Sequence, residues 1–302
     1  MNLPVARYHF RARTRAPLRL PDYAGSQLRG AFGHALRRIA CMTRLRDCGQ
    51  CPLQSTCPYP LIFEAPGEDR DLLTHAPNPF VIEPPPAGAR LLEGGESFDF
   101  AMVLIGQALP QLPLIVLAWE SALAQGLGKE RSRCELLEVH CEDDPEPVYR
   151  SGCGRIREHR PQPAPPPTAG QPLRLRLLTP MRLRKDGRCV GRRELDASTL
   201  LIALARRTQA LRDRHCPGQA PIDFRALADH AATIGLEGDL RWFDWTRYSS
   251  RQQREMTLGG LIGELRLTGD LDGLLPLLHL GQWLHLGKNA TFGLGHYRME
   301  TL

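Results

Sequence analysis

The same order of strand-like and helix-like segments occurs twice in this 302-residue chain, once before and once after a proline-rich stretch. In the first half, apolar residues recur at helical spacing after Ser26, which can act as the N-cap of that helix. A second helix pattern in this half ends at glycine. The expected elements of the first half are a strand at 8–20, a helix at 26–41, a strand at 96–106, a helix at 112–128 and a strand at 134–143.

The proline-rich stretch RPQPAPPPTAGQP, residues 160–172, has the composition of a semi-rigid linker. After it the second cycle begins, and its long helix has Asp196 or Ser198 near the start. The expected elements of the second half are a strand at 172–184, a helix at 196–215, a strand or strand pair at 258–269, a helix at 271–287 and a closing strand at 292–302.

Each half therefore approximates the βαββαβ order of the ferredoxin-like fold, which is also the order of RRM domains. The chain is long enough for two domains that each bury a core. We predict an α+β protein with tandem ferredoxin-like domains at 1–159 and 173–302, joined by the linker at 160–172.

Arginine accounts for 36 of the 39 basic residues, and only Lys129, Lys185 and Lys288 are lysine. Arginine bias in a GC-rich genome would explain much of this excess, but it does not explain the clustering. Residues 1–60 hold ten arginines against two acids, Asp22 and Asp47. Because a guanidinium matches phosphate oxygens and stacks on bases, this charge distribution predicts nucleic-acid binding.

No apolar run in the sequence is long enough to span a bilayer. The N-terminal residues also lack the apolar core of a signal peptide. We therefore expect a cytoplasmic protein without a membrane partner.

Four cysteines lie close together in a C-x6-C-x2-C-x5-C pattern, Cys41, Cys48, Cys51 and Cys57. Disulfides are uncommon in the cytoplasm, and thiolates select zinc or an iron–sulfur cluster. We expect these residues to form a cysteine knuckle, 41–57, inserted in the first domain and holding a structural zinc; an iron–sulfur cluster and a set of metal-free thiols are the alternatives. Cys41 is the least secure ligand because it can still belong to the preceding helix.

The segment HLGKNATFGLGHY, residues 285–297, lies between the last helix and the last strand. A dinucleotide fingerprint has the opposite order, with its glycines after a strand and before a helix. The segment also lacks the Gly-Lys-Ser/Thr ending of an ATP loop, so a mononucleotide cofactor is not expected. Its glycines favour approach of the backbone to an extended phosphate chain, with five candidate contacts, Gly287, Lys288, Asn289, Gly293 and Gly295.

Four stretches together resemble one family, the CRISPR-associated endoribonucleases of the repeat-associated mysterious protein (RAMP) superfamily, which process precursor CRISPR RNA. The resemblance covers both ends of the chain and leaves roughly 70–240 unmatched. The four stretches are QLRGAFGHALRR at 27–38, the knuckle running into YPLIFEAP at 59–66, the segment 245–271 beginning WTRYSSRQQREM, and the segment 274–299 ending FGLGHYRM.

The resemblance implies two ferredoxin-like domains that bind a CRISPR repeat RNA. It also implies cleavage without a catalytic metal, in which the RNA's own 2′-hydroxyl attacks and the products carry 2′,3′-cyclic phosphate and 5′-hydroxyl ends. The processed guide, the crRNA, would be retained and passed to other subunits of an interference complex in antiviral defence. The family loop often begins Gly-x-Gly, whereas His285 stands at the earlier glycine position here.

Three residues are the candidates for catalysis. His34 lies on the first helix, where many family members place a catalytic histidine, and histidine suits acid or base work near neutral pH. Lys288 could stabilise the transition state, and Tyr248 could orient or deprotonate the 2′-hydroxyl. Three further histidines, His279, His285 and His296, are reserve candidates, although His279, on an apolar helix, fits better as a satisfied core histidine.

Two groups of arginines are candidates for holding RNA. The first group is on the first helix, and the second is either one face of a helix or a basic loop. They are Arg29, Arg37 and Arg38, then Arg247, Arg251 and Arg254. Two other functions stay open, a catalytically silent crRNA-binding subunit of an interference complex and an unrelated zinc-stabilised nucleic-acid-binding adaptor.

Overall fold

The computed structural model describes residues 3–64, 77–167, 172–249 and 254–302, with the backbone alone at 245–249 and 254–258. The chain divides into two compact units. The N-terminal unit comprises Leu3–Pro163 together with Arg214–Pro217, and the C-terminal unit comprises Ala164–Asp213 and Gly218–Leu302. The boundary between them falls within the proline-rich stretch.

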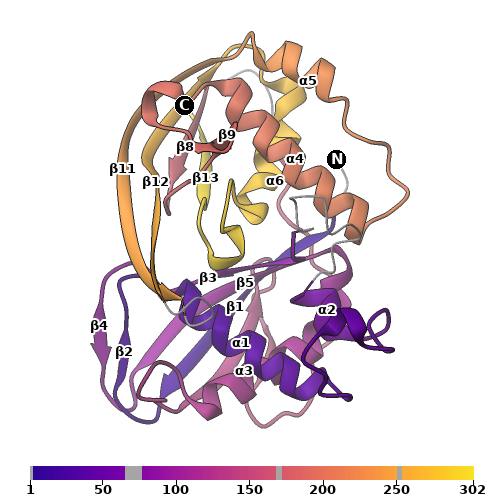
Figure 1. Ribbon diagram of the computed structural model, residues 1–302, viewed down its shortest axis with the longest axis vertical. Helices are drawn as coiled ribbons and strands as arrows, with labels where there is room; N and C mark the ends of the chain where they lie inside the picture. The colour runs from indigo at the N-terminus through magenta and orange to yellow at the C-terminus, as the bar shows by residue number, and fades with distance from the viewer. Residues whose placement is uncertain (1–2, 65–76, 168–171, 250–253) are drawn as a thin grey trace. The chain divides into compact units, whose positions relative to one another are not determined.

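The N-terminal unit is built on a five-stranded antiparallel sheet with the order β3-β5-β1-β6-β7. Two helices, α1 and α3, lie against one face of this sheet (Figure 1). The elements are β1 (Val5–Thr14), α1 (Gly25–Ala40), β3 (Phe80–Glu83), β5 (Ser97–Ile105), α3 (Leu112–Gln125), β6 (Cys134–Cys141) and β7 (Pro147–Arg150).

The core of this unit is an aromatic cluster around Trp119 of α3, which is completely buried. Its ring lies 4.5 Å from that of Phe100, 5.1 Å from that of Phe32 and 5.9 Å from that of Phe10, measured between centroids. Phe32 belongs to α1, so the cluster joins both helices to the two central strands. This packing positions the outer face of α1.

This unit also contains short elements between its main strands and helices. Two of them, β2 and β4, pair as a separate antiparallel ribbon. They are β2 (Leu18–Leu20), the 3₁₀ turn η1 (Cys48–Gln50), α2 (Pro58–Ile62), β4 (Arg90–Leu92) and the 3₁₀ turn η2 (Gly106–Gln111).

The C-terminal unit has a four-stranded antiparallel sheet with the order β11-β12-β8-β13. Leucines of α4 and α6 pack on the apolar face of this sheet. The elements are β8 (Leu173–Leu177), β9 (Arg184–Lys185), β10 (Arg188–Cys189), the 3₁₀ turn η3 (Arg192–Glu194), α4 (Ala197–His215), α5 (Phe224–Ala231), β11 (Gly235–Ser249), β12 (Arg254–Thr268), the 3₁₀ turn η4 (Asp272–Leu274), α6 (Leu275–Leu284), the 3₁₀ turn η5 (Ala290–Phe292) and β13 (Tyr297–Thr301).

Both units have the same sheet topology once their principal strands are numbered in chain order. In each, the second strand pairs with the third, the third with the first, and the first with the fourth. One helix follows the first strand and another follows the third, as the ferredoxin-like fold requires. The predicted α+β architecture with tandem ferredoxin-like folds is confirmed.

Several predicted element ends were wrong. Helix α1 begins at Gly25, so its N-cap position is occupied by Ala24 and not by Ser26. The strand predicted at 172–184 is β8, which ends at Leu177 and does not continue to 184. Asp196 does cap α4, since its carboxylate accepts a hydrogen bond from the backbone N–H of Thr199 at 2.6 Å.

One buried histidine gives the N-terminal unit an expected pH dependence. His215 is 2% exposed, and its Nε2 lies 3.3 Å from the carbonyl oxygen of Pro77. Burial, followed by the nearby charge of Arg214, lowers the pKa of His215 from 6.5 to about 4. As the pH falls, His215 is therefore protonated in the unfolded chain before it is protonated in the folded chain. The free energy of unfolding decreases between the unfolded-state pKa of 6.5 and the folded-state pKa of about 4.

We expect the free energy of unfolding to fall by about 2–3 kcal/mol from this residue between pH 6.5 and pH 4. Urea unfolding at several pH values measures it, comparing the wild type with His215→Gln and with a control at the exposed His9, His9→Gln. An equal pH slope in wild type and His215→Gln would contradict the assignment.

No helix in the described part of the chain is both long enough and apolar enough to cross a membrane.

Candidate nucleic-acid interface

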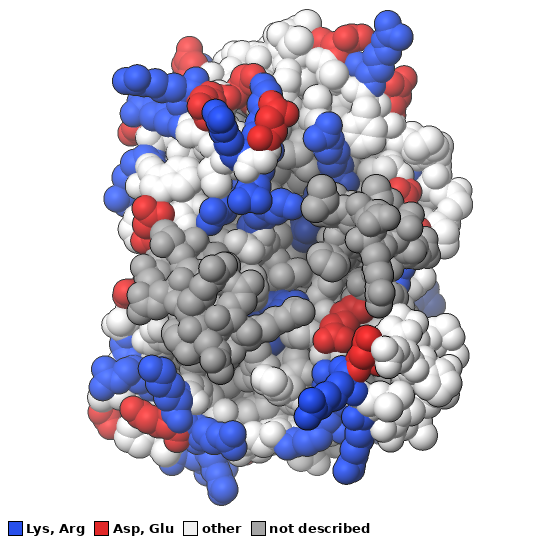
Figure 2. All heavy atoms as spheres, viewed as in Figure 1, with Lys and Arg blue, Asp and Glu red and all other residues white. Residues whose placement is uncertain are grey.

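Four of the ten arginines in residues 1–60 are paired with acids from elsewhere in the N-terminal unit. Arg7 bonds to the buried Glu83 at 2.9 Å and to Glu142 at 2.5 Å. Three further arginines of the first segment pair with acids on the neighbouring strands, namely Arg11 with Asp99 and Glu138, and Arg13 and Arg15 with Glu135. Figure 2 shows the same mixing, with carboxylates interspersed among the basic side chains on the face in view. The count of charges along the sequence therefore overstates the field at the surface of this unit.

The outer face of α1 carries the leading catalytic candidate. His34 is exposed and lies one helical turn from Arg38, which is also exposed and donates to the hydroxyl of Ser121. One turn earlier on the same face, Gly30 has open space where a Cβ would stand. A polynucleotide backbone can therefore approach this face closely between Gly30 and Arg38.

The other two predicted RNA-binding arginines of α1 are engaged within the unit. The guanidinium of Arg29 stacks 4.2 Å from the ring centre of Phe63. That of Arg37 donates to the carbonyl oxygens of Leu45 and Arg46 at 2.7 and 2.8 Å. Both residues are half-buried, so Arg38 is the arginine of this group that the structure presents to solvent.

The glycine-rich loop of the C-terminal unit is packed tightly against its own chain. A Cβ at Gly287 would stand 2.4 Å from the carbonyl oxygen of Arg182, and one at Gly295 would stand 1.9 Å from that of Leu286. Both glycines have positive φ, 90° and 74°. Close packing and backbone conformation thus account for these two glycines, whereas the sequence suggested approach to phosphate.

Backbone hydrogen bonds hold the loop to the segment that follows β8. Lys288 donates its N–H to the carbonyl oxygen of Arg182, and Gly295 donates to that of Pro180, at 2.8 and 3.0 Å. Thr179 donates its hydroxyl to the carbonyl oxygen of Gly293. The side chain of Lys288 remains exposed, and the left-handed Asn289 at φ 64° turns the chain beside it. Of the five predicted loop residues, Lys288 is the one whose charge reaches solvent.

We expect Gly287→Ala to lower the free energy of unfolding by about 1–3 kcal/mol, because the new methyl adds a backbone clash to an unfavourable φ. Gly187→Ala is the matched control, since Gly187 in the same unit has φ 78° and nothing within 4 Å of a Cβ. Chemical denaturation of both variants separates the clash from the φ penalty. Equal losses would show that the loop does not pack as described.

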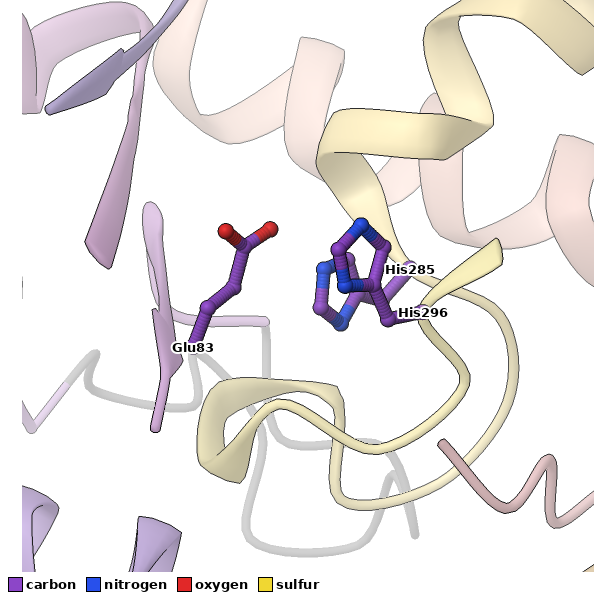
Figure 3. Close-up of side chains that lie close together, drawn as sticks. All are labelled: Glu83, His285 and His296. Atoms are coloured by element: carbon purple, nitrogen blue, oxygen red, sulfur yellow. The ribbon is translucent and has the colours of Figure 1, made fainter. Parts of the chain in front are cut away.

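Two histidines flank this loop and lie against one another. The imidazoles of His285 and His296 are stacked, with centroids 4.5 Å apart and planes 10° apart (Figure 3). His285 is fully buried and adopts φ 60° and ψ 159°, a region that is strained for any residue with a side chain. The family loop often has glycine at this position, and the backbone of His285 adopts a conformation that favours glycine. The imidazole of His285 is held by stacking on that of His296.

A further arginine supports the start of this loop and was not indicated by the sequence. Arg207 of α4 donates from Nε to the carbonyl oxygen of Leu284, the last residue of α6, at 2.7 Å. Burial lowers the pKa of Arg207 to about 10. No spacing in the sequence relates this residue to the loop, because the contact depends on how α4 packs against α6.

The remaining histidine candidate has ordinary structural partners. Nε2 of His279 lies 2.7 Å from the carbonyl oxygen of Ala164, and its Nδ1 lies 3.2 Å from the amide nitrogen of Gln282. The residue is half-buried on α6. It is a satisfied histidine, as expected, although it is not in the core.

Two residues of the second arginine group, Arg247 and Arg254, lie on paired strands and not on a helix. Arg247 and Tyr248 are at the end of β11 and Arg254 is at the start of β12, with Tyr248 paired to Glu255 in the backbone register. The side chains of these three residues lie outside the described part of the structure, as does Arg251 entirely. For Arg247 and Arg254 the helical alternative is therefore wrong, since both are in β-strands.

Comparisons with known proteins match both units. A family model named AF_1859_N and described as an N-terminal domain matches residues 3–161, just over half of the chain. The model of the CRISPR-associated endoribonuclease Cas6 matches residues 175–297. The chain belongs to the AF_1859_N family and is a CRISPR-associated Cas6-like protein. The Cas6 match includes the β11–β12 hairpin and the glycine-rich loop, which the sequence had singled out.

An uncharacterized protein of Archaeoglobus fulgidus is 22% identical to this Cas6-like chain over 293 residues, 93% of each protein. Among solved structures, a Cas6 product complex is 17% identical, with a TM-score of 0.60 over 98% of this chain and all of that one. A chain of a partial Cas6-RT-Cas1–Cas2 complex is 14% identical, with a TM-score of 0.57 over 99% of this chain. The Cas6-like chain spans only 46% of that longer chain. These likenesses establish a shared fold.

Proposed function

We propose that this Cas6-like chain is a metal-independent endoribonuclease that binds CRISPR repeat RNA and cleaves precursor crRNA. The observation that carries the proposal is the outer face of α1, where exposed His34 lies one turn from exposed Arg38 and beside the open surface at Gly30. Such a face offers a proton-transfer group, a cation and room for a phosphate backbone together. The Cas6 family model, which describes an endoribonuclease, supports the substrate class.

The chemistry follows from what these side chains can do. Attack of the 2′-hydroxyl on the adjacent phosphorus loses the hydroxyl proton and breaks the bond to the 5′-oxygen, which gains a proton. The products are therefore a 2′,3′-cyclic phosphate and a 5′-hydroxyl. His34 would carry one of these protons, and a cation would stabilise the charge on the phosphorane. Arg38 is the cation beside His34, and Lys288 is an exposed cation on the glycine-rich loop of the C-terminal unit.

RNA holding would fall mainly to Arg38, Lys288 and the β11–β12 hairpin, which bears Arg247 and Arg254. The glycine-rich loop would present Lys288 and Asn289, while its packed glycines fix the loop in shape. Folded RNA is held chiefly through phosphate and 2′-hydroxyl contacts, so the affinity should fall steeply as salt rises.

We further propose that the processed guide stays bound and is passed to an interference complex. The name of the partial Cas6-RT-Cas1–Cas2 complex places a Cas6 beside other CRISPR proteins, which supports protein partners for this chain as well. Cytoplasmic location is part of the same proposal, because RNA processing would occur there.

The test is incubation of the purified chain with labelled repeat RNA in excess EDTA. One cut per repeat, with a cyclic phosphate on the upstream product and a 5′-hydroxyl on the downstream product, is the expected result. Cleavage only after a divalent metal is restored, or products with 5′-phosphates, would contradict the proposed chemistry.

A catalytically silent crRNA-binding subunit is the second candidate. It is favoured because Arg29 and Arg37 contact other groups of the same unit. Fewer cations are therefore available beside His34 than the sequence predicted. The same experiment decides, since tight binding of uncut repeat RNA would support this candidate. The assignment as a CRISPR-associated Cas6-like protein excludes the third candidate function, a nucleic-acid-binding adaptor unrelated to CRISPR.

A further inference from the structure

The four clustered cysteines line one small cavity in the N-terminal unit. Its volume is about 100 Å³, and its walls also include apolar side chains such as Leu45 and Leu53. The cysteines come from separate local structures: Cys41 directly follows α1, Cys48 begins η1, Cys51 directly follows η1, and Cys57 directly precedes α2. None of the four is in a disulfide.

The chain around this cavity has little regular structure of its own. Between α1 and α2 the one helical element is the three-residue turn η1. Large apolar side chains face solvent on this segment, with Met42 84%, Leu45 44% and Leu53 39% exposed. Arg37 bonds to two carbonyl oxygens of the loop, and Cys57 Sγ lies 3.9 Å from the carbonyl oxygen of Ala40. The segment between α1 and α2 buries few apolar side chains, so it needs another source of stability. A bound inorganic group can stabilise such a segment.

A single zinc ion does not fit the thiols as they stand. Zinc–sulfur bonds of about 2.3 Å in a tetrahedron bring every pair of sulfurs to about 3.8 Å. Among the described residues, no three cysteine sulfurs lie within 4.8 Å of one another. The cysteines thus surround a common space without converging on one point.

An iron–sulfur cluster fits this arrangement better. In a [4Fe–4S] cluster each of four cysteines binds a different iron, so the thiolates are spread around a core that contributes its own bulk. The donor set here is four cysteines around one cavity, and thiolate ligands favour iron–sulfur clusters as well as zinc.

We propose that Cys41, Cys48, Cys51 and Cys57 hold a [4Fe–4S] cluster, each cysteine binding one iron, in place of the zinc expected from the sequence. The cluster would clamp the end of α1 to the start of α2, where Tyr59 and Ile62 enter the core. Its role is structural. It stabilises the helix that carries His34 and takes no part in moving protons.

The direct test is the composition of the full chain, produced with both iron and zinc available and purified without oxygen. We expect about four irons and about four acid-labile sulfides per chain, with broad visible absorption that bleaches on reduction by dithionite. One zinc per chain without sulfide would overturn the proposal, as would a metal-free protein in which all four thiols react with a thiol reagent.

A pair of serine variants locates the cluster. Cys51→Ser should lose most of the iron, the sulfide and the visible absorption, whereas Cys153→Ser, at an exposed cysteine outside the knuckle, should keep them. Retention of full iron and sulfide in folded Cys51→Ser would exclude the assigned ligand set. If Cys51→Ser does not fold, the composition of the wild type still decides.

These measurements need no RNA, so they are independent of the proposed function. A chain that cuts repeat RNA but holds no iron would refute the cluster alone, and an iron-loaded chain that ignores RNA would refute the function alone.

Discussion

Replacing His34 by alanine should lower the single-turnover rate constant of repeat RNA cleavage by about 10²–10⁴-fold and change RNA affinity by less than about twofold. The reason is the position of the side chain: it is exposed on the outer face of α1 and no part of the core depends on it. A group that moves a proton in the transition state affects the rate of cleavage, whereas one that only holds RNA affects affinity. Rate and affinity are measured on the same preparation.

The matched control is His9→Ala, at an exposed histidine on β1 of the same unit. It should cleave like the wild type. If His34→Ala cleaved at the wild-type rate, or if it lost affinity in proportion to rate, His34 would not be the proton-transfer group. Arg38→Ala should then be compared, because a cation on the same face could still contribute through the phosphate.

Trp119→Ala should lower the free energy of unfolding of the N-terminal unit by about 3–5 kcal/mol. Trp119 is completely buried, and its ring touches aromatic side chains from α1, β1 and β5. Deleting it leaves a cavity that those rings cannot fill by small shifts. A urea titration followed by circular dichroism measures the loss.

Leu117→Ala on the same helix is the control, because Leu117 is 49% exposed. It should cost well under half as much. Similar losses for the two variants would mean that the aromatic cluster is not the principal packing of this unit.

Periodicity in the sequence predicted the fold class and most of the principal elements, because the strands and helices of each cycle bury one apolar face. Helix α1 and strand β6 lie close to where the pattern placed them. The pattern missed α5, all of β11 and also β3, which is the second principal strand of the N-terminal unit. Strand β11 resists detection because alternation is weak along it, and only its pairing with β12 over fifteen residues defines it.

The electrostatics could not be predicted from the sequence for a different reason. Arg11, Arg13 and Arg15 look unopposed along the chain, but their acidic partners lie more than 80 residues away on β5 and β6. Cross-strand pairing creates these contacts, and a count over a sequence window does not contain it. The same applies to β8, whose Arg174 and Arg176 are opposed by Glu264 and Glu300 on the neighbouring strands.

The glycine-rich loop was recognised in the sequence, but the structural role of its glycines was not predicted. Gly287 and Gly295 are required by the approach of the loop to its own backbone, which depends on tertiary packing. Lys288 stays exposed, and for this residue the sequence-based prediction as a phosphate contact stands as a proposal.

Recognition of folded repeat RNA is the central property proposed for this Cas6-like chain, and the most direct test of it is the affinity of the chain for a repeat stem-loop. In dilute buffer we expect the chain to bind the stem-loop much more tightly than duplex DNA of equal length. We also expect the logarithm of the association constant to fall linearly with the logarithm of the salt concentration. Absence of binding to the stem-loop at low salt, or equal affinity for the DNA duplex, would contradict the account.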